Sequence, residues 1–244
     1  MTTATVDHTV AKFGGRPRLR VFIKGGTDVR DSLLPRGLGG TQLDFGLDDV
    51  VEEAFGGAYH VDTYHEPPAP AVALLKQLQA AMSNHRQDGA VDTTSILDIR
   101  PDVVVLSISS DLTADLDEFD RAMPEVIRLL KDAIGAHILV FNGSTLDPSA
   151  ARTTNYHRAP DSPALAVYKL NLRLIQLSML AGISIIDADR VAAEIGADGH
   201  IRGLVEYGPV LCRALCREVV RVLDDYGFFE ERPLVPQLGR ARQR

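Results

Sequence analysis

Short apolar runs alternate along this chain with longer segments whose apolar residues recur at helical spacing. The runs predict strands near residues 19 to 24, 58 to 64, 102 to 108, 137 to 141 and 183 to 186. The segments between and after them predict helices at 28 to 34, 47 to 55, 72 to 82, 117 to 134, 164 to 180, 187 to 195 and 209 to 226. The uninterrupted run Val103 to Leu106 is typical of a strand that is covered on both faces.

Alternation of this kind implies right-handed crossovers between parallel strands. We therefore expect an α/β protein with a three-layer α/β/α sandwich around a five-stranded parallel sheet. The prediction gives a flexible arm at 1–17, a single domain at 18–227 and a tail at 228–244. Two stretches lack a clear pattern and are predicted to be loops: residues 83 to 100 and 196 to 207.

Charge and composition exclude some classes of function. The net charge of -7 argues against a nucleic-acid surface, which needs clustered positive charge. No run approaches the ~20 apolar residues that span a bilayer. The N-terminus lacks the features of a secretion signal, so a cytoplasmic protein without membrane contact is expected. Cys212 and Cys216 lie four apart in a predicted helix and are interpreted as core thiols.

Polar residues gather where the predicted strands end. Gly25 to Asp28, Ser109 to Asp111 and Asn142 to Ser144 each follow a strand, and Asp198 to His200 precede the last helix. Ligands of open α/β sheets bind at the carboxyl edge where such loops converge. A hydroxyl, hydrogen-bond donors, an Asp and a His are the groups that acyl transfer requires. Because nucleotide-binding glycine motifs are absent, no cofactor is expected, and no metal is assigned.

In the order of these elements, residues 18 to 226 resemble the SGNH, or GDSL-like, hydrolase superfamily. The resemblance implies an SGNH-hydrolase or flavodoxin-like fold. That family carries Gly-Asp-Ser directly after its first strand, where this chain has Gly25-Gly26-Thr27. The run Gly-Gly-Thr-Asp-Val-Arg-Asp also resembles a Gly-Ser-Cys-Val-Thr-Arg-Asp variant seen in SGNH-like proteins linked to polysaccharides. In both comparisons Thr27 stands at the position of the nucleophile.

The resemblance implies a role for each site residue. Thr27 would attack the acyl group, His200 would take its proton, and Asp198 would orient His200. The remaining candidates would stabilise the oxyanion or bind substrate: Gly26, Arg30, Ser110, Asn142 and His157.

Several positions depart from the family pattern. The methyl group of Thr27 crowds an attack, and the residue serves equally well as a helix cap. Ser32, about two helical turns further on, is a second candidate nucleophile. The second-strand glycine is missing, Ser110 replaces an Asn, and Asp198 to His200 is one residue shorter than Asp-x-x-His, so that Glu194 is an alternative partner for the histidine.

Two functions remain open at this point. The first is an SGNH-like hydrolase or acyltransferase acting on an ester or acyl group of a small molecule, a glycan or a carrier-bound intermediate. The second is a catalytically degenerate member that serves as a binding protein or a non-hydrolytic biosynthetic enzyme. The oligomeric state is also left open: the apolar residues Phe228-Phe229 and Pro233 to Leu238 could pack on their own domain or on a second subunit of a homo-oligomer.

Overall fold

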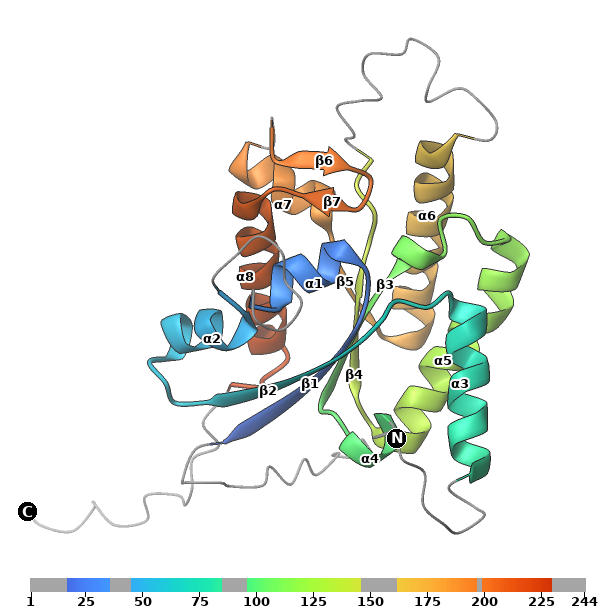
Figure 1. Cartoon of the computed structure of the whole chain (residues 1–244), viewed down its shortest axis with the longest axis horizontal. Coiled ribbons are helices and arrows are strands. Elements are labelled where there is room, and N and C mark those ends of the chain that lie inside the picture. Colours follow the sequence, from blue (N-terminus) through green and yellow to red (C-terminus); the bar gives the residue numbers. More distant parts are fainter. Residues whose placement is uncertain (1–16, 36–44, 85–95, 146–161, 197–198, 230–244) are drawn as a thin grey trace, which may run out of the picture.

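A parallel sheet of five strands, in the order β2-β1-β3-β4-β5, runs through the part of the chain that the structure describes (Figure 1). The structure is a computed structural model, and it describes residues 17–35, 45–84, 96–145, 162–196 and 199–229. The strands are β1 (Arg18–Lys24), β2 (His60–Glu66), β3 (Val103–Ser107), β4 (His137–Phe141) and β5 (Ser184–Ile186). The predicted five-stranded parallel sheet is therefore confirmed.

Alternate side chains of each strand face opposite layers of helices. In β3, Val103 and Val105 belong to one apolar core, and Val104 and Leu106 belong to the other. The first core contacts α1 (Thr27–Leu33), α2 (Leu47–Phe55), α7 (Ala188–Ile195) and α8 (Pro209–Asp225). The second contacts α3 (Ala71–Asn84), α4 (Ile96–Ile99), α5 (Leu116–Ile134) and α6 (Pro163–Ala181). The two layers lie on either side of the sheet in Figure 1, which confirms the α/β/α sandwich.

Glycine residues end two of the helices. Gly56 and Gly182 end α2 and α6 with φ of 61° each, in the left-handed region that glycine enters without steric cost. The two stretches predicted as loops hold short elements. The four-residue helix α4 lies in the first, and the second holds a hairpin of β6 (Ile201–Gly203) and β7 (Glu206–Tyr207). Elements of two to four residues are too short to show a periodicity.

The described residues after α8 pack against the rest of the domain. Phe229 is buried, stacks on Phe55 and contacts the ring of Tyr59, whose hydroxyl donates to the Phe229 carbonyl. Phe228 lies beside His137. These two phenylalanines therefore pack on their own chain, and the other predicted contact segment, Pro233 to Leu238, is outside the described residues.

Burial and helix length bear on two further predictions. Cys212 and Cys216 are both fully buried with free thiols, which confirms them as core residues. Among the described residues, no helix combines the length and the apolar character needed to cross a membrane.

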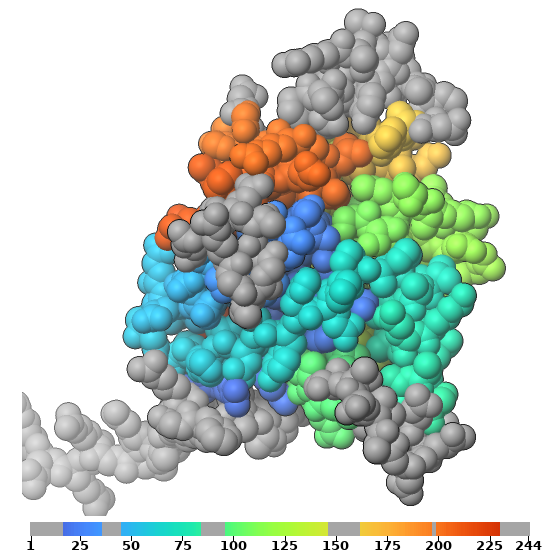
Figure 2. All heavy atoms as spheres, viewed as in Figure 1, coloured from blue at the N-terminus to red at the C-terminus, as the bar shows by residue number. Residues whose placement is uncertain are grey.

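The strand order determines where loops meet. From β1 the chain moves outward to β2 and then returns past β1 to β3, so the crossovers reverse direction between β1 and β3. The carboxyl ends of the two strands open into a crevice at such a switch point, where ligands of this fold bind. Figure 1 shows the β6–β7 hairpin across the same edge, above α1, and in Figure 2 its orange atoms adjoin the blue atoms of the α1 region.

Candidate active site

The turn after β1 consists of two glycines that bring the backbone against the β3 loop. A Cβ atom at Gly25 would lie 2.7 Å from the Val29 side chain and 3.3 Å from the Cβ atom of Ser107. One at Gly26 would lie 2.8 Å from the Oγ atom of Ser109. Real Cβ atoms essentially never approach other atoms within 3.0 Å. Glycine is therefore needed at position 25 to make room for the Val29 side chain and at position 26 to let the β3 loop approach.

Thr27 is the first residue of α1, and Gly26 occupies the N-cap position. Because the N-cap residue is a glycine, the alternative that Thr27 caps the helix is wrong. Instead its hydroxyl, on a half-buried side chain, donates to the carbonyl oxygen of Val205 at 3.2 Å. Thr27 therefore links the first strand turn to the hairpin.

The turn of the hairpin, Leu204-Val205, connects two loops of the site edge. Val205 accepts from Thr27, and the Leu204 carbonyl accepts from the backbone N–H of Ser144 at 2.8 Å. His200 lies at the opposite end of the hairpin, where its carbonyl accepts from the N–H of Gly208. Within the described residues no hydrogen bond joins Thr27 and His200.

Two predicted residues, Asp198 and His157, are outside the described residues, and their roles stay predictions. Glu194, the alternative partner for His200, forms an ion pair with Arg190, with the Oε1 and Nη1 atoms 2.5 Å apart. That pair lies along α7 and does not involve the imidazole.

A buried carboxyl group beside Thr27 was not among the predicted site residues. Asp28 is 0% exposed, and its Oδ2 atom accepts a hydrogen bond from the Ser107 hydroxyl. The Oγ atoms of Ser107 and Ser109 are 2.9 Å apart, and the Ser109 N–H donates to Ser107 Oγ at 2.9 Å. Burial raises the pKa of Asp28 to about 6, although the hydrogen bond from Ser107 opposes the rise. The three residues form one continuous chain, here called the Asp28–Ser107–Ser109 chain.

Ser110 belongs to the same short 3₁₀ turn, Ile108–Ser110, and is partly exposed. The hydroxyl that lies against Gly26, however, is that of Ser109. Asp111, which follows, holds another element: its Oδ1 atom accepts from the Ala71 N–H at 2.8 Å, at the start of α3. Burial raises the pKa of Asp111 to about 6.

Asn142 serves the junction of β4 and α7. Its Nδ2 atom donates to Asp187 Oδ1 at 3.0 Å, and its Oδ1 atom accepts from the Ala188 N–H at 2.8 Å. One N–H of the amide remains for the predicted substrate contact, which stays a prediction.

Ser32, the second candidate nucleophile, is 0% exposed and donates to the carbonyl of Asp28 within α1. A hydroxyl in that position cannot reach a substrate.

Arg30 lies one turn into α1 and is partly exposed, and its Nε atom donates to Asp31 Oδ1 at 3.1 Å. It also acts on His65 at the end of β2, where the family has its glycine-containing second block. Partial burial lowers the pKa of His65, and the positive charge of Arg30 lowers it further, while a hydrogen bond to the Gly25 backbone opposes both effects. Nothing in the sequence pattern predicts that His65 lies against the Gly25 backbone. Among the described residues no cluster of three or more His, Cys, Asp or Glu side chains gathers as a metal site.

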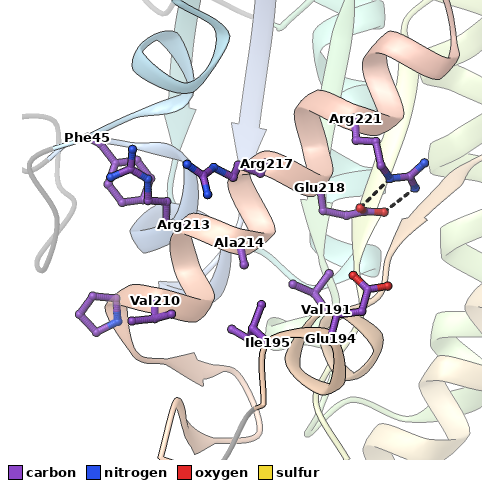
Figure 3. A pocket seen from close by; sticks show the side chains of 11 residues that line it. Phe45, Val191, Glu194, Ile195, Val210, Arg213, Ala214, Arg217, Glu218 and Arg221 are labelled. Atoms are coloured by element: carbon purple, nitrogen blue, oxygen red, sulfur yellow. Dashed lines mark hydrogen bonds and ion pairs between the residues drawn. The ribbon is translucent and has the colours of Figure 1, made fainter. Parts of the chain in front are cut away.

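A separate groove of about 670 Å³ lies on the outer side of α7 and α8 (Figure 3). Its apolar side chains include Val191, Ile195 and Val210, and Arg221 with Glu218 forms the ion pair drawn in the figure. Of the predicted site residues that the structure describes, Glu194, the alternative partner of His200, lines this groove, and Thr27, Ser110 and His200 do not.

Comparison with known proteins identifies the fold. No protein-family model and no curated protein sequence matches the chain. Solved structures do match, among them a member of the lipolytic G-D-S-L family from Veillonella parvula, with a TM-score of 0.54, 14% identity and coverage of 84% of this chain and 98% of that one. A lipase/acylhydrolase from Enterococcus faecalis matches with a TM-score of 0.53, 13% identity and coverage of 85% and 96%.

A catalytic mutant of Axe2, an acetylxylan esterase from Geobacillus stearothermophilus, matches with a TM-score of 0.53 and 12% identity over 83% of this chain and 93% of that one. At these identities the likeness concerns the fold. The chain has the fold of the GDSL/SGNH hydrolases, as the sequence predicted.

Proposed function

We propose that this protein catalyses acyl transfer, as an SGNH-like hydrolase or acyltransferase acting on an ester or acyl group. One observation carries the proposal. Two partly exposed hydroxyl groups, those of Thr27 and Ser109, flank Gly26 at the switch point of the sheet, beside the buried carboxyl of Asp28. A hydroxyl group and a proton acceptor close to it are the parts that this chemistry needs.

The substrate class is the broader part of the proposal. The structural neighbours include lipolytic hydrolases and an acetylxylan esterase, and an acetylated sugar is therefore the first substrate to test. A small-molecule ester and a carrier-bound acyl group follow. Gly26 N–H and Ser110 are the proposed oxyanion donors, and Arg30, one helical turn after Thr27, is the proposed contact for a negatively charged substrate.

A second function has its own observation. Thr27 donates its hydroxyl proton to a backbone carbonyl, and His200 lies at the other end of the hairpin. A protein that had kept the pocket and lost hydrolysis would look the same at these two residues. Its function would then be binding or a non-hydrolytic biosynthetic step.

Ester hydrolysis distinguishes the two functions. The full chain is assayed on 4-nitrophenyl acetate and on an acetylated xylo-oligosaccharide, and its mass is measured after treatment with a fluorophosphonate. Acyl transfer predicts turnover and a mass gain of one adduct. If the protein shows no turnover and gains no mass, the result contradicts acyl transfer and favours the binding protein.

The roles predicted from the sequence need separate variants. Thr27→Ala and His200→Ala are compared with Ser83→Ala, a control that removes an exposed hydroxyl from α3. Unchanged hydrolysis in both site variants would contradict the assignment of Thr27 and His200 but leave acyl transfer itself standing.

A further inference from the structure

We propose that Ser109 is the hydroxyl that accepts the acyl group, and that Asp28 takes up its proton through Ser107. This inference rests on the proposed acyl transfer and names the group that performs it. It starts from the Asp28–Ser107–Ser109 chain, which none of the roles predicted from the sequence uses.

The hydrogen bonds of the Asp28–Ser107–Ser109 chain define the direction in which a proton passes along it. The Ser107 hydroxyl has one proton and donates it to Asp28 Oδ2. Its oxygen accepts from the Ser109 N–H. The oxygen atoms of Ser107 and Ser109 are 2.9 Å apart, and because the single Ser107 proton is already given to a carboxylate, which has none to give, we assign the Ser109 hydroxyl as the donor of this contact. The Ser109 proton therefore points inward along the chain. The Ser109 oxygen lies directly beside Gly26.

The carboxyl at the inner end is suited to receive a proton. Asp28 has no exposed surface. Burial raises its pKa, although the Ser107 hydroxyl and the backbone N–H groups of Val29 and Asp28 stabilise the charged form. A carboxylate whose pKa is raised by burial is a stronger base than one in water. The neighbouring ionisable groups are Asp31 on α1, Tyr207 on β7 and Cys212 on α8, and burial raises the pKa of both Tyr207 and Cys212, which keeps them neutral.

Ser109 and Thr27 differ in what receives their protons. The Thr27 hydroxyl donates to the Val205 carbonyl, and a peptide carbonyl does not take up a proton near neutral pH. Ser109 is connected to a carboxylate through a single intervening hydroxyl. Both side chains are partly exposed, so access does not separate them. The proton path favours Ser109.

The proposed reaction balances without a cofactor. The Ser109 oxygen forms a bond to the acyl carbon, its proton passes to Ser107, and the Ser107 proton passes to Asp28. The bond to the leaving alcohol then breaks, and the alcohol takes a proton from the Ser107 hydroxyl, which regains one from Asp28. Water for hydrolysis, or a second alcohol for transfer, attacks the acyl-Ser109 ester and gives its proton to Ser107, whose own proton passes to Asp28. The bond between the acyl carbon and the Ser109 oxygen then breaks, and Ser109 takes a proton back from Ser107, which regains one from Asp28.

The site of labelling tests the inference in the unaltered protein. The full chain is treated with a fluorophosphonate, digested and sequenced by mass spectrometry, which separates Thr27 from Ser109 and resolves Ser109 from its neighbours. We expect the adduct on Ser109. An adduct on Thr27 would overturn the inference while supporting acyl transfer, and hydrolysis without any adduct on Ser109 would overturn it as well. If the protein shows no hydrolysis and no adduct forms, both the proposed function and the inference are overturned.

Variants test the relay. Ser107→Ala and Asp28→Asn should slow labelling of Ser109 by about 100-fold or more, which is the usual contribution of a general base. Ser83→Ala serves as the control, and thermal unfolding checks that each variant folds. The labelling rate of the unaltered protein should rise with pH around 6 and lose this dependence in Asp28→Asn. Equal rates and equal pH profiles in folded variants would overturn the role of Asp28.

Discussion

The hydroxyl of Thr27 donates a hydrogen bond to the carbonyl oxygen of Val205, which lies 178 residues further along the chain. This bond fastens the hairpin across the carboxyl edge of the sheet. The Leu204 carbonyl makes the matching contact with Ser144. Thr27 therefore has a structural role in addition to any chemical one, and the two roles give different results in variants.

Thr27→Val should weaken the fold modestly, because it removes the hydroxyl and keeps the shape. The loss of one hydrogen bond costs about 1 kcal/mol of the free energy of unfolding. Thr27→Ser keeps the hydroxyl and is the control. Urea unfolding measures both, and equal stabilities of the two variants would show that the contact with Val205 contributes nothing.

Gly26→Ala should impair function more than folding. The added Cβ would lie 2.8 Å from Ser109 Oγ, and that hydroxyl would have to turn away. Gly25→Ala should instead destabilise the protein, since its Cβ would meet the packed side chains of Val29 and Ser107. Thermal unfolding and ester hydrolysis of both variants test this contrast, and a fully active Gly26→Ala would place the reaction elsewhere.

Asp111→Asn should stabilise the protein at high pH. Burial raises the pKa of Asp111 to about 6 in the folded state, above its ordinary value of 3.8, and the folded protein therefore prefers the neutral form. The stability that this group contributes is complete below pH 4 and is lost as the pH rises through 6. The loss is on the order of 2–3 kcal/mol.

The asparagine variant keeps an acceptor for the Ala71 N–H and has no charge to bury. It should therefore match the unaltered protein near pH 4 and exceed its melting temperature at pH 8. A variant that is less stable at pH 8 would show that the carboxylate is favourably paired in the folded protein.

Asp28 should affect stability and activity in opposite directions. Its pKa is also raised to about 6, so the folded state loses stability as the pH rises through that value. The same ionisation creates the proton acceptor that the relay needs. Asp28→Asn is thus expected to gain in melting temperature relative to the unaltered protein at pH 8 while it loses ester hydrolysis there. A variant with both lower stability and full activity would contradict both expectations.

The sheet could be predicted from the sequence because its strands are short, apolar and separated by helical patterns. Val103 to Leu106 is buried on both faces as the pattern indicates. The hairpin could not be predicted, because β6 and β7 hold three and two residues. Its contact with Thr27 depends on a fold that brings distant segments together.

The candidate site was predicted in position but only partly in its residues. Gly26 and Thr27 lie at the switch point because they follow β1. Asp28 looks in the sequence like a residue that begins a helix, and its burial depends on the surrounding β3, β7 and α8. Ser109 and Ser110 are adjacent hydroxyls with no difference in pattern. Only the close approach of the β1 and β3 loops distinguishes them.

Hydrolysis of an acetyl ester by the double variant Thr27→Ala/Ser109→Ala shows whether the reaction takes place beside Gly26, because the variant lacks both hydroxyls that flank this residue. We expect turnover by the unaltered protein and by Ser83→Ala, and a loss of at least about 100-fold in the folded double variant. A double variant that hydrolyses the ester as fast as the unaltered protein would contradict the claim that acyl transfer takes place at this edge of the sheet.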